Sequence, residues 1–150
     1  MLERVSTYSF VLALHIMAVL AAYGLPLAYP LLLPYVRRHH PEALAGVHAV
    51  QYRLNVVLTG PGTVLILAFG IYLATKGHHW GEVWVTVPVI IIALIAVLGG
   101  GVIVPATKRL AALAGAGGEA YETVYRRYMA VEILLGLLVL AAVFMMAAKP

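Results

Sequence analysis

The chain alternates four long apolar stretches with short polar connections. The apolar stretches cover residues 5–36, 54–75, 83–107 and 128–148. The first three contain no Lys, Arg, Asp or Glu, and the fourth contains one, Glu132. Each stretch can cross a bilayer as a helix, which takes about 20 apolar residues. Strands of a membrane barrel would be about ten residues long with alternating polarity, so the pattern predicts four membrane-spanning α-helices.

The composition supports this prediction. Of the 150 residues, 63% are hydrophobic and 11% are charged, whereas a soluble domain carries about 25% charged residues and has a large surface to cover. We therefore expect one all-α domain over residues 1–150, a four-helix transmembrane bundle with up-down-up-down topology. The first apolar stretch is too long for a cleaved signal peptide, so we expect it to be a retained span.

The basic residues are distributed unequally between the two ends of this bundle. Seven flank the first and third connections: Arg37, Arg38, Arg53, Lys108, Arg109, Arg126 and Arg127. Three flank the other side: Arg4, Lys76 and Lys149. The positive-inside rule then predicts a bacterial-type inner (plasma) membrane protein with cytoplasmic basic connections and both termini outside. The net charge of +4 needs no nucleic-acid partner, and the expected partners are the lipid bilayer and a second copy or another membrane subunit.

Prolines and glycines indicate where the helices depart from regularity. Pro26, Pro30 and Pro34 each lack a backbone donor, so we expect an irregular end to the first helix. Pro61 is expected to kink the second helix, with neighbouring groups satisfying the freed carbonyl. The glycines at 99–101 would let another helix, or a flat macrocycle, approach the third helix closely. We favour helix packing.

His15, in the first apolar stretch, is a candidate axial ligand for haem b, because a neutral imidazole is a common metal donor. The alternative is a hydrogen bond to a neighbouring helix. Met145 or Met146 could supply a second ligand, although methionines more often serve packing. The remaining histidines lie in or near the connections, at other depths: His39, His40, His48, His78 and His79.

Arg53 and Glu132 are the other ionisable residues that we predict to lie within the membrane, where such groups are costly and often functional. One interpretation is a buried ion pair between the second and fourth helices. In the other, Arg53 binds a carboxylate such as a haem propionate, and Glu132 relays protons or accepts one from a substrate.

Two further chemistries receive weaker support. His78 and His79, with Met145 and Met146, could form an outward-facing copper site because imidazole and thioether ligands suit copper. Adjacent histidines point apart in an extended loop, which argues against it. The chain has no cysteine, which excludes disulfides and thiolate metal sites.

The second span resembles that of HemJ-type protoporphyrinogen oxidases, through Arg53-Leu54-Asn55, Gly60-Pro61 and Phe69-Gly70. Glu132, followed by an apolar run closing on Lys149-Pro150, is similar to the family's fourth span. Leu14-His15 is similar to its first span. The resemblance implies a four-span fold and a haem b ligated by His15.

The third span departs from that family, because residues 89–105 contain no ionisable side chain. Leu31 also stands where the family carries an arginine. The resemblance therefore implies a divergent relative of the HemJ and CopD-like proteins and does not carry the oxidase activity across.

Three functional hypotheses follow. The first is a haem-b-binding membrane protein with a redox or porphyrin-handling role, His15 as ligand and Arg53 near a propionate. The second is a non-catalytic structural or accessory subunit. The third, a small copper or solute transporter, is disfavoured because unbroken helices leave little room for a pathway.

Overall fold

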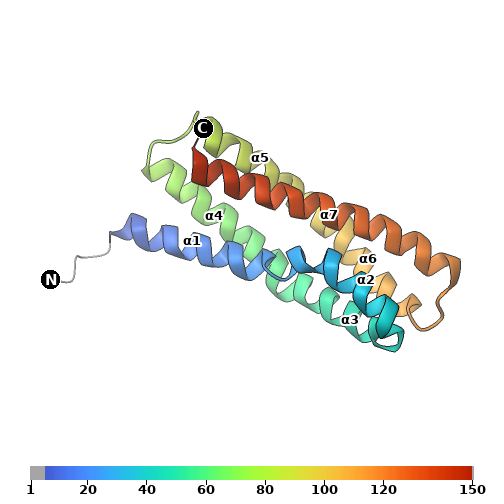
Figure 1. Cartoon of the computed structure of the whole chain (residues 1–150). Helices are drawn as coiled ribbons and strands as arrows, with labels where there is room; N and C mark the ends of the chain where they lie inside the picture. The colour runs from blue at the N-terminus through green and yellow to red at the C-terminus, as the bar shows by residue number, and fades with distance from the viewer. Residues whose placement is uncertain (1–5, 150) are drawn as a thin grey trace.

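The computed structural model describes residues 6–149, and helices are the only regular secondary structure within them (Figure 1). The first part of the chain holds α1 (Thr7–Tyr23), a 3-10 turn (Pro26–Ala28) and α2 (Tyr29–His39). A second 3-10 turn (Pro41–Ala43) leads into α3 (Leu44–Leu54), a π-helical segment (Asn55–Thr59) and α4 (Gly60–Lys76). The last part holds α5 (Val83–Leu98), a second π-helical segment (Gly99–Ile103), α6 (Val104–Leu113) and α7 (Gly118–Ala148).

Three continuous helical runs are long and apolar enough to cross a membrane: Pro41–Lys76, Val83–Leu113 and Gly118–Ala148. The fourth candidate is the pair Thr7–Tyr23 and Pro26–His39, which is bent by 40°. The all-helical prediction and its membrane-like helices are thus confirmed. Within the described residues there are three candidate spans, or four if the bent pair is one span.

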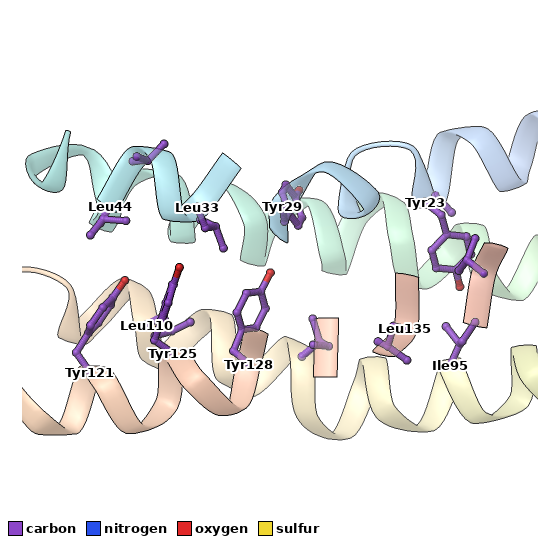
Figure 2. Packing of buried hydrophobic residues seen from close by; sticks show 14 of the residues in the cluster. Tyr23, Tyr29, Leu33, Leu44, Ile95, Leu110, Tyr121, Tyr125, Tyr128 and Leu135 are labelled. Carbon is purple, nitrogen blue, oxygen red and sulfur yellow. The ribbon is translucent and has the colours of Figure 1, made fainter. Parts of the chain in front are cut away.

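The helices extend further than their apolar stretches. The run Pro41–Lys76 has 36 residues, or about 54 Å at 1.5 Å per residue, against about 30 Å of hydrocarbon. The extensions are held by packing: α3 lies on α6, and α2 and α6 lie on α7. Figure 2 shows Tyr121, Tyr125 and Tyr128 projecting from α7 toward Leu33 and Leu44 on the opposite side.

The expected irregularity of the first helix begins at Gly24, just before Pro26, but the helix resumes after it. Pro30 and Pro34 lie within α2, so α2 continues to His39 where an irregular end was expected. Pro30 occupies the first turn, whose backbone donors have no helical acceptor. The break is therefore confined to residues 24–28.

Each π-helical segment ends two residues before a proline. Pro61 stands in the first turn of α4 and Pro105 in the first turn of α6. A proline cannot donate to the carbonyl four residues earlier, and its ring clashes with that carbonyl. Here the helix accommodates the proline by widening by one residue per turn. The Gly60 N–H bonds to the Asn55 carbonyl, and the Val104 N–H to that of Gly99, both five residues back. The kink expected at Pro61 takes this form.

α1 and α4 approach each other closely at Gly62, a glycine not singled out from the sequence. A Cβ atom at Gly62 of α4 would lie 2.8 Å from the Cβ of Ala22 in α1. A Cβ atom at any of the glycines 99–101, by contrast, would have no neighbour within 4 Å. The close helix packing expected at this triplet is therefore not formed within the described residues.

Both ends of α7, and the turns beside them, define the two ends of the bundle (Figure 1). The C-terminus lies with the α4–α5 connection and the start of α1 at one end. The α2–α3 and α6–α7 turns lie at the other. The seven basic residues that flank these two turns are thus gathered at one end of the bundle.

Candidate functional site

The irregular segments of three helical runs meet at one cavity. The cavity has a volume of about 260 Å³, and its walls are mostly apolar. Tyr23 and Pro26 line it at the α1–α2 break, Asn55 and Thr59 from the first π-helical segment, and Gly99, Gly100 and Ile103 from the second. The long helix α7 closes it with Glu132, Leu135, Gly136 and Val139. Because π-helical turns are often found at functional sites, this is the candidate site.

Three hydroxyl groups in the cavity wall already have structural partners. The Tyr23 hydroxyl and the Thr63 hydroxyl are 2.6 Å apart. Thr63 donates to the Thr59 carbonyl at 2.7 Å, and Thr59 donates to the Ala22 carbonyl at 3.1 Å. These bonds join α1 to α4 and satisfy carbonyls near the irregular turns, so they position the wall.

Asn55 and Glu132 are the polar groups that remain for a ligand. Asn55 is 6% exposed, and its side-chain nitrogen has no hydrogen-bond partner among the described residues. Glu132 is 5% exposed and makes no ion pair within residues 6–149. An ionised carboxylate is costly to bury unless it is paired. Glu132 is therefore suited to take up a proton or to bind a donor group.

A chain of buried hydrogen bonds runs from the basic end toward this carboxyl. Gln51 donates from Nε2 to the Tyr128 hydroxyl at 3.1 Å, which leaves its Oε1 to accept from His48 Nδ1 at 2.7 Å. With its hydrogen on Nδ1, a neutral His48 accepts at Nε2 from the Tyr121 hydroxyl, 3.0 Å away. The Tyr128 hydrogen is then free for Glu132, one turn further along α7 and in contact with it.

The direction of these bonds has an electrostatic consequence. Every donor in the chain points away from Tyr121 and toward Glu132. Hydrogen bonds in such a chain polarise one another, so the network favours negative charge on the Glu132 carboxyl. In Figure 2, the hydroxyl of Tyr128 points across the bundle from α7, as the chain requires.

His15 lies in a separate, smaller cavity beside the first. It is 6% exposed, and its Nδ1 has no hydrogen-bond partner among the described residues. Met146 lines the same cavity, whereas Met145 lines neither of the two. Tyr23, Ile95 and Val139 line both cavities and lie between them.

The donor atoms at His15 are suitable for haem iron, but the space is not. The cavity has a volume of about 60 Å³, whereas pockets for drug-sized ligands are about 300–1,000 Å³, and a haem is no smaller. A Cβ atom at Gly70 would lie 3.3 Å from His15 Cε1, so α4 already packs against the imidazole edge. A haem does not fit in this helix arrangement.

Arg53 does not meet Glu132. Its side chain is exposed on α3 and lines neither cavity, and the ion pairs in the described part of the chain join Arg37 to Glu122 and His40 to Glu42. Successive helical residues are rotated by about 100°. Arg53 stands two residues before the buried Asn55, and so it faces the opposite side. The predicted pair is not formed, and Arg53 is not placed to bind a propionate in either cavity.

The predicted copper ligands are not gathered either. His78 is exposed in the α4–α5 connection, and the His79 ring packs against Trp84 with centroids 4.9 Å apart. Within residues 6–149 there is no group of three or more His, Cys, Asp or Glu side chains that could hold a metal ion.

The polar residues that line the cavity beside Glu132 or form the hydrogen-bond chain toward it were not predicted from the sequence. Asn55, His48, Gln51 and Tyr128 are ordinary polar residues of helices, and nothing in one sequence shows which of them face inward. The prolines at 61 and 105 were the available signal, because each marks an irregular turn beside the cavity. No protein-family model, curated protein or solved structure matches this chain.

Proposed function

We propose that this chain is a four-span membrane protein that binds a small lipid-soluble molecule in the cavity at the centre of the bundle, with Glu132 as its proton-exchanging group. The observation that carries the proposal is the juxtaposition of Asn55 and Glu132 in one mostly apolar cavity. Apolar walls with a few convergent polar groups are typical of small-molecule sites.

The two polar groups indicate the chemistry of the ligand. The Asn55 nitrogen offers a donor, and the Glu132 carboxyl offers an acceptor when ionised. A hydroxyl or phenol at the end of an apolar molecule can accept from the first and donate to the second. Such a ligand reaches the cavity through the bilayer. Glu132 then accepts a hydrogen bond from this group, and the chain through Tyr128 stabilises its ionised form.

The membrane arrangement belongs to the same proposal. The bent pair α1–α2 serves as the first span, with its break beside the cavity. The end that carries the α2–α3 and α6–α7 turns faces the cytoplasm because it holds the larger share of basic residues. The expectation of unbroken spans, which disfavoured a transporter, no longer applies, since discontinuous helices are a feature of transporter binding sites.

Cavity filling tests the proposal. A Cβ atom at Gly136 would meet Leu27 at an ordinary 3.4 Å, so Gly136→Leu places its branched end in the cavity. Ala141→Leu, on an exposed position of α7, is the matched control. Organic extracts of the purified proteins are compared by mass spectrometry. The site is supported if wild type and Ala141→Leu retain a lipid-soluble molecule and Gly136→Leu retains about tenfold less of it. Equal retention in all three contradicts it.

Haem binding at His15 is the second candidate, favoured by the unpartnered Nδ1 and by Met146 in the same cavity. It requires the helices to separate around Tyr23, Ile95 and Val139. The test is an absorption spectrum of protein made with ample haem, oxidised and then reduced, beside His15→Ala. A Soret band lost in the variant supports haem, and its absence from wild type excludes it. If neither cavity holds a ligand, the chain is a structural or accessory subunit.

A further inference from the structure

A groove between α6 and α7 lies outside the two interior cavities. It has a volume of about 420 Å³. Its floor is formed by small and apolar residues, among them Gly101, Pro105, Ala106 and Val124. Arg109 and Arg127 line it as well, one from each helix. The groove thus combines an apolar channel with a pair of guanidinium groups.

Both guanidinium groups are available for a ligand. Arg109 and Arg127 are exposed and make no ion pair among the residues that the structure describes. The groove between α2 and α7 also carries two arginines that make no ion pair within residues 6–149, Arg38 and Arg126, but its third arginine is engaged. There Arg37 pairs with Glu122 and lies 4.8 Å from the Tyr125 ring centroid.

The floor of the groove stays open because it has a glycine where a side chain would stand. A Cβ atom at Gly101 would meet nothing within 4 Å. No other part of the described chain therefore covers the groove at this point. Gly101 and Pro105 lie in the apolar part of a run that is long enough to cross a membrane, directly before Lys108 and Arg109, so the groove joins the apolar part of this run to its basic end.

We propose that this groove binds one anionic phospholipid, with the phosphate between Arg109 and Arg127 and an acyl chain along Gly101, Pro105 and Ala106. The assignment follows from charge complementarity with the two arginines and from the continuity of the apolar floor with the bilayer. Guanidinium groups bind phosphate oxygens with good geometry, and basic pockets between membrane helices suit acidic head groups. This proposal is independent of the ligand of the interior cavity.

The experiment measures binding of fluorescent phosphatidylglycerol to the full chain in detergent, with phosphatidylcholine as the zwitterionic comparison. The site variant is Arg109→Gln with Arg127→Gln. The control is Arg53→Gln with Lys108→Gln, which removes the same charge from exposed residues of the same end that line none of these grooves. Because all four side chains are exposed, little loss of folding is expected, and melting temperatures check this.

We expect wild type to prefer phosphatidylglycerol and the site variant to lose affinity for it about ten- to thirtyfold, at roughly 1 kcal/mol per basic residue. The control should stay within about threefold of wild type. Gly101→Leu, which fills the floor without changing charge, should also weaken binding. Four results would each overturn the proposal. Two concern the variants: an equal loss of phosphatidylglycerol affinity in the control, or full affinity in Gly101→Leu. The other two concern the ligand: equal binding of phosphatidylcholine, or displacement of the lipid by millimolar inorganic phosphate.

Discussion

Asn55, whose side-chain nitrogen has no partner among the described residues, and the buried Glu132 line the same cavity from two helical runs. Asn55 opens the π-helical segment that precedes Pro61, and Glu132 lies within the uninterrupted helix α7. The irregular turn therefore places an amide with an unpartnered donor in the cavity wall, and the regular helix places an acid there.

Glu132→Gln should separate function from folding. The substitution keeps the shape of the side chain and removes a charge that is costly to bury. We expect the melting temperature in detergent to equal or exceed that of wild type, while retention of the lipid-soluble ligand falls about tenfold or more. If the protein unfolds or the ligand is retained in full, Glu132 has a structural role.

Tyr128→Phe should destabilise the bundle. It leaves the Gln51 Nε2 donor buried without its acceptor, and an unsatisfied buried donor costs about 1–3 kcal/mol. Tyr72→Phe is the control, since the Tyr72 hydroxyl makes no hydrogen bond within residues 6–149. Unfolding in a denaturing detergent measures the difference. Equal stability of the two variants would show that the chain of hydrogen bonds is not formed.

Gly62→Ala should disturb the contact between α1 and α4, where a Cβ atom would lie 2.8 Å from that of Ala22. Overpacking of this kind costs about 1–3 kcal/mol. The double variant Gly62→Ala with Ala22→Gly should recover part of the loss, because the two sites are in contact.

The control for this helix contact is Gly46→Ala in α3. A Cβ atom there meets nothing within 4 Å, so the change should be neutral or stabilise by up to about 1 kcal/mol. If Gly62→Ala behaves like Gly46→Ala, α1 does not approach α4 at this distance.

The proposed orientation can be tested with single cysteines, because the chain contains none of its own. His40→Cys lies in the α2–α3 turn, and His79→Cys lies in the α4–α5 connection. With a membrane-impermeant maleimide on intact cells, we expect labelling of position 79 alone. Inverted membrane vesicles should reverse the result. Labelling of both positions from one side would contradict four spans.

Much of the fold could be predicted from hydropathy. Apolar stretches longer than a membrane span leave few alternatives to helices, and the turns at 77–82 and 114–117 fall where polar residues and glycines interrupt them. The packing of the extensions through α3 and the first part of α7 could not be predicted. Their polar residues are stabilised by contacts between segments distant in sequence, such as His48 with Tyr121.

The candidate site could be predicted only in part. Glu132 is conspicuous as the one acid of an apolar stretch, and it lines the central cavity. Arg53 was expected at a depth in the membrane similar to that of Glu132, but the rotation of the helix decides which way it faces. Gln51 and Asn55 are buried, so Arg53, midway between them, faces outward. Which face of an almost wholly apolar helix is buried depends on its neighbours, and one sequence does not show them.

The most direct test of the central claim uses a hydrophobic carbodiimide, which is itself a small lipid-soluble molecule and adds covalently to protonated carboxyl groups. Intact and peptide mass spectrometry of membrane-embedded protein should show one addition, at Glu132. Glu132→Gln should show none, and labelling of Gly136→Leu should slow about tenfold. A water-soluble carbodiimide should modify exposed acids such as Glu42 and Glu82 and leave Glu132 untouched. If the hydrophobic reagent fails to label Glu132, or labels Gly136→Leu as fast as wild type, then Glu132 does not stand in a cavity that lipid-soluble molecules enter, and the account is contradicted.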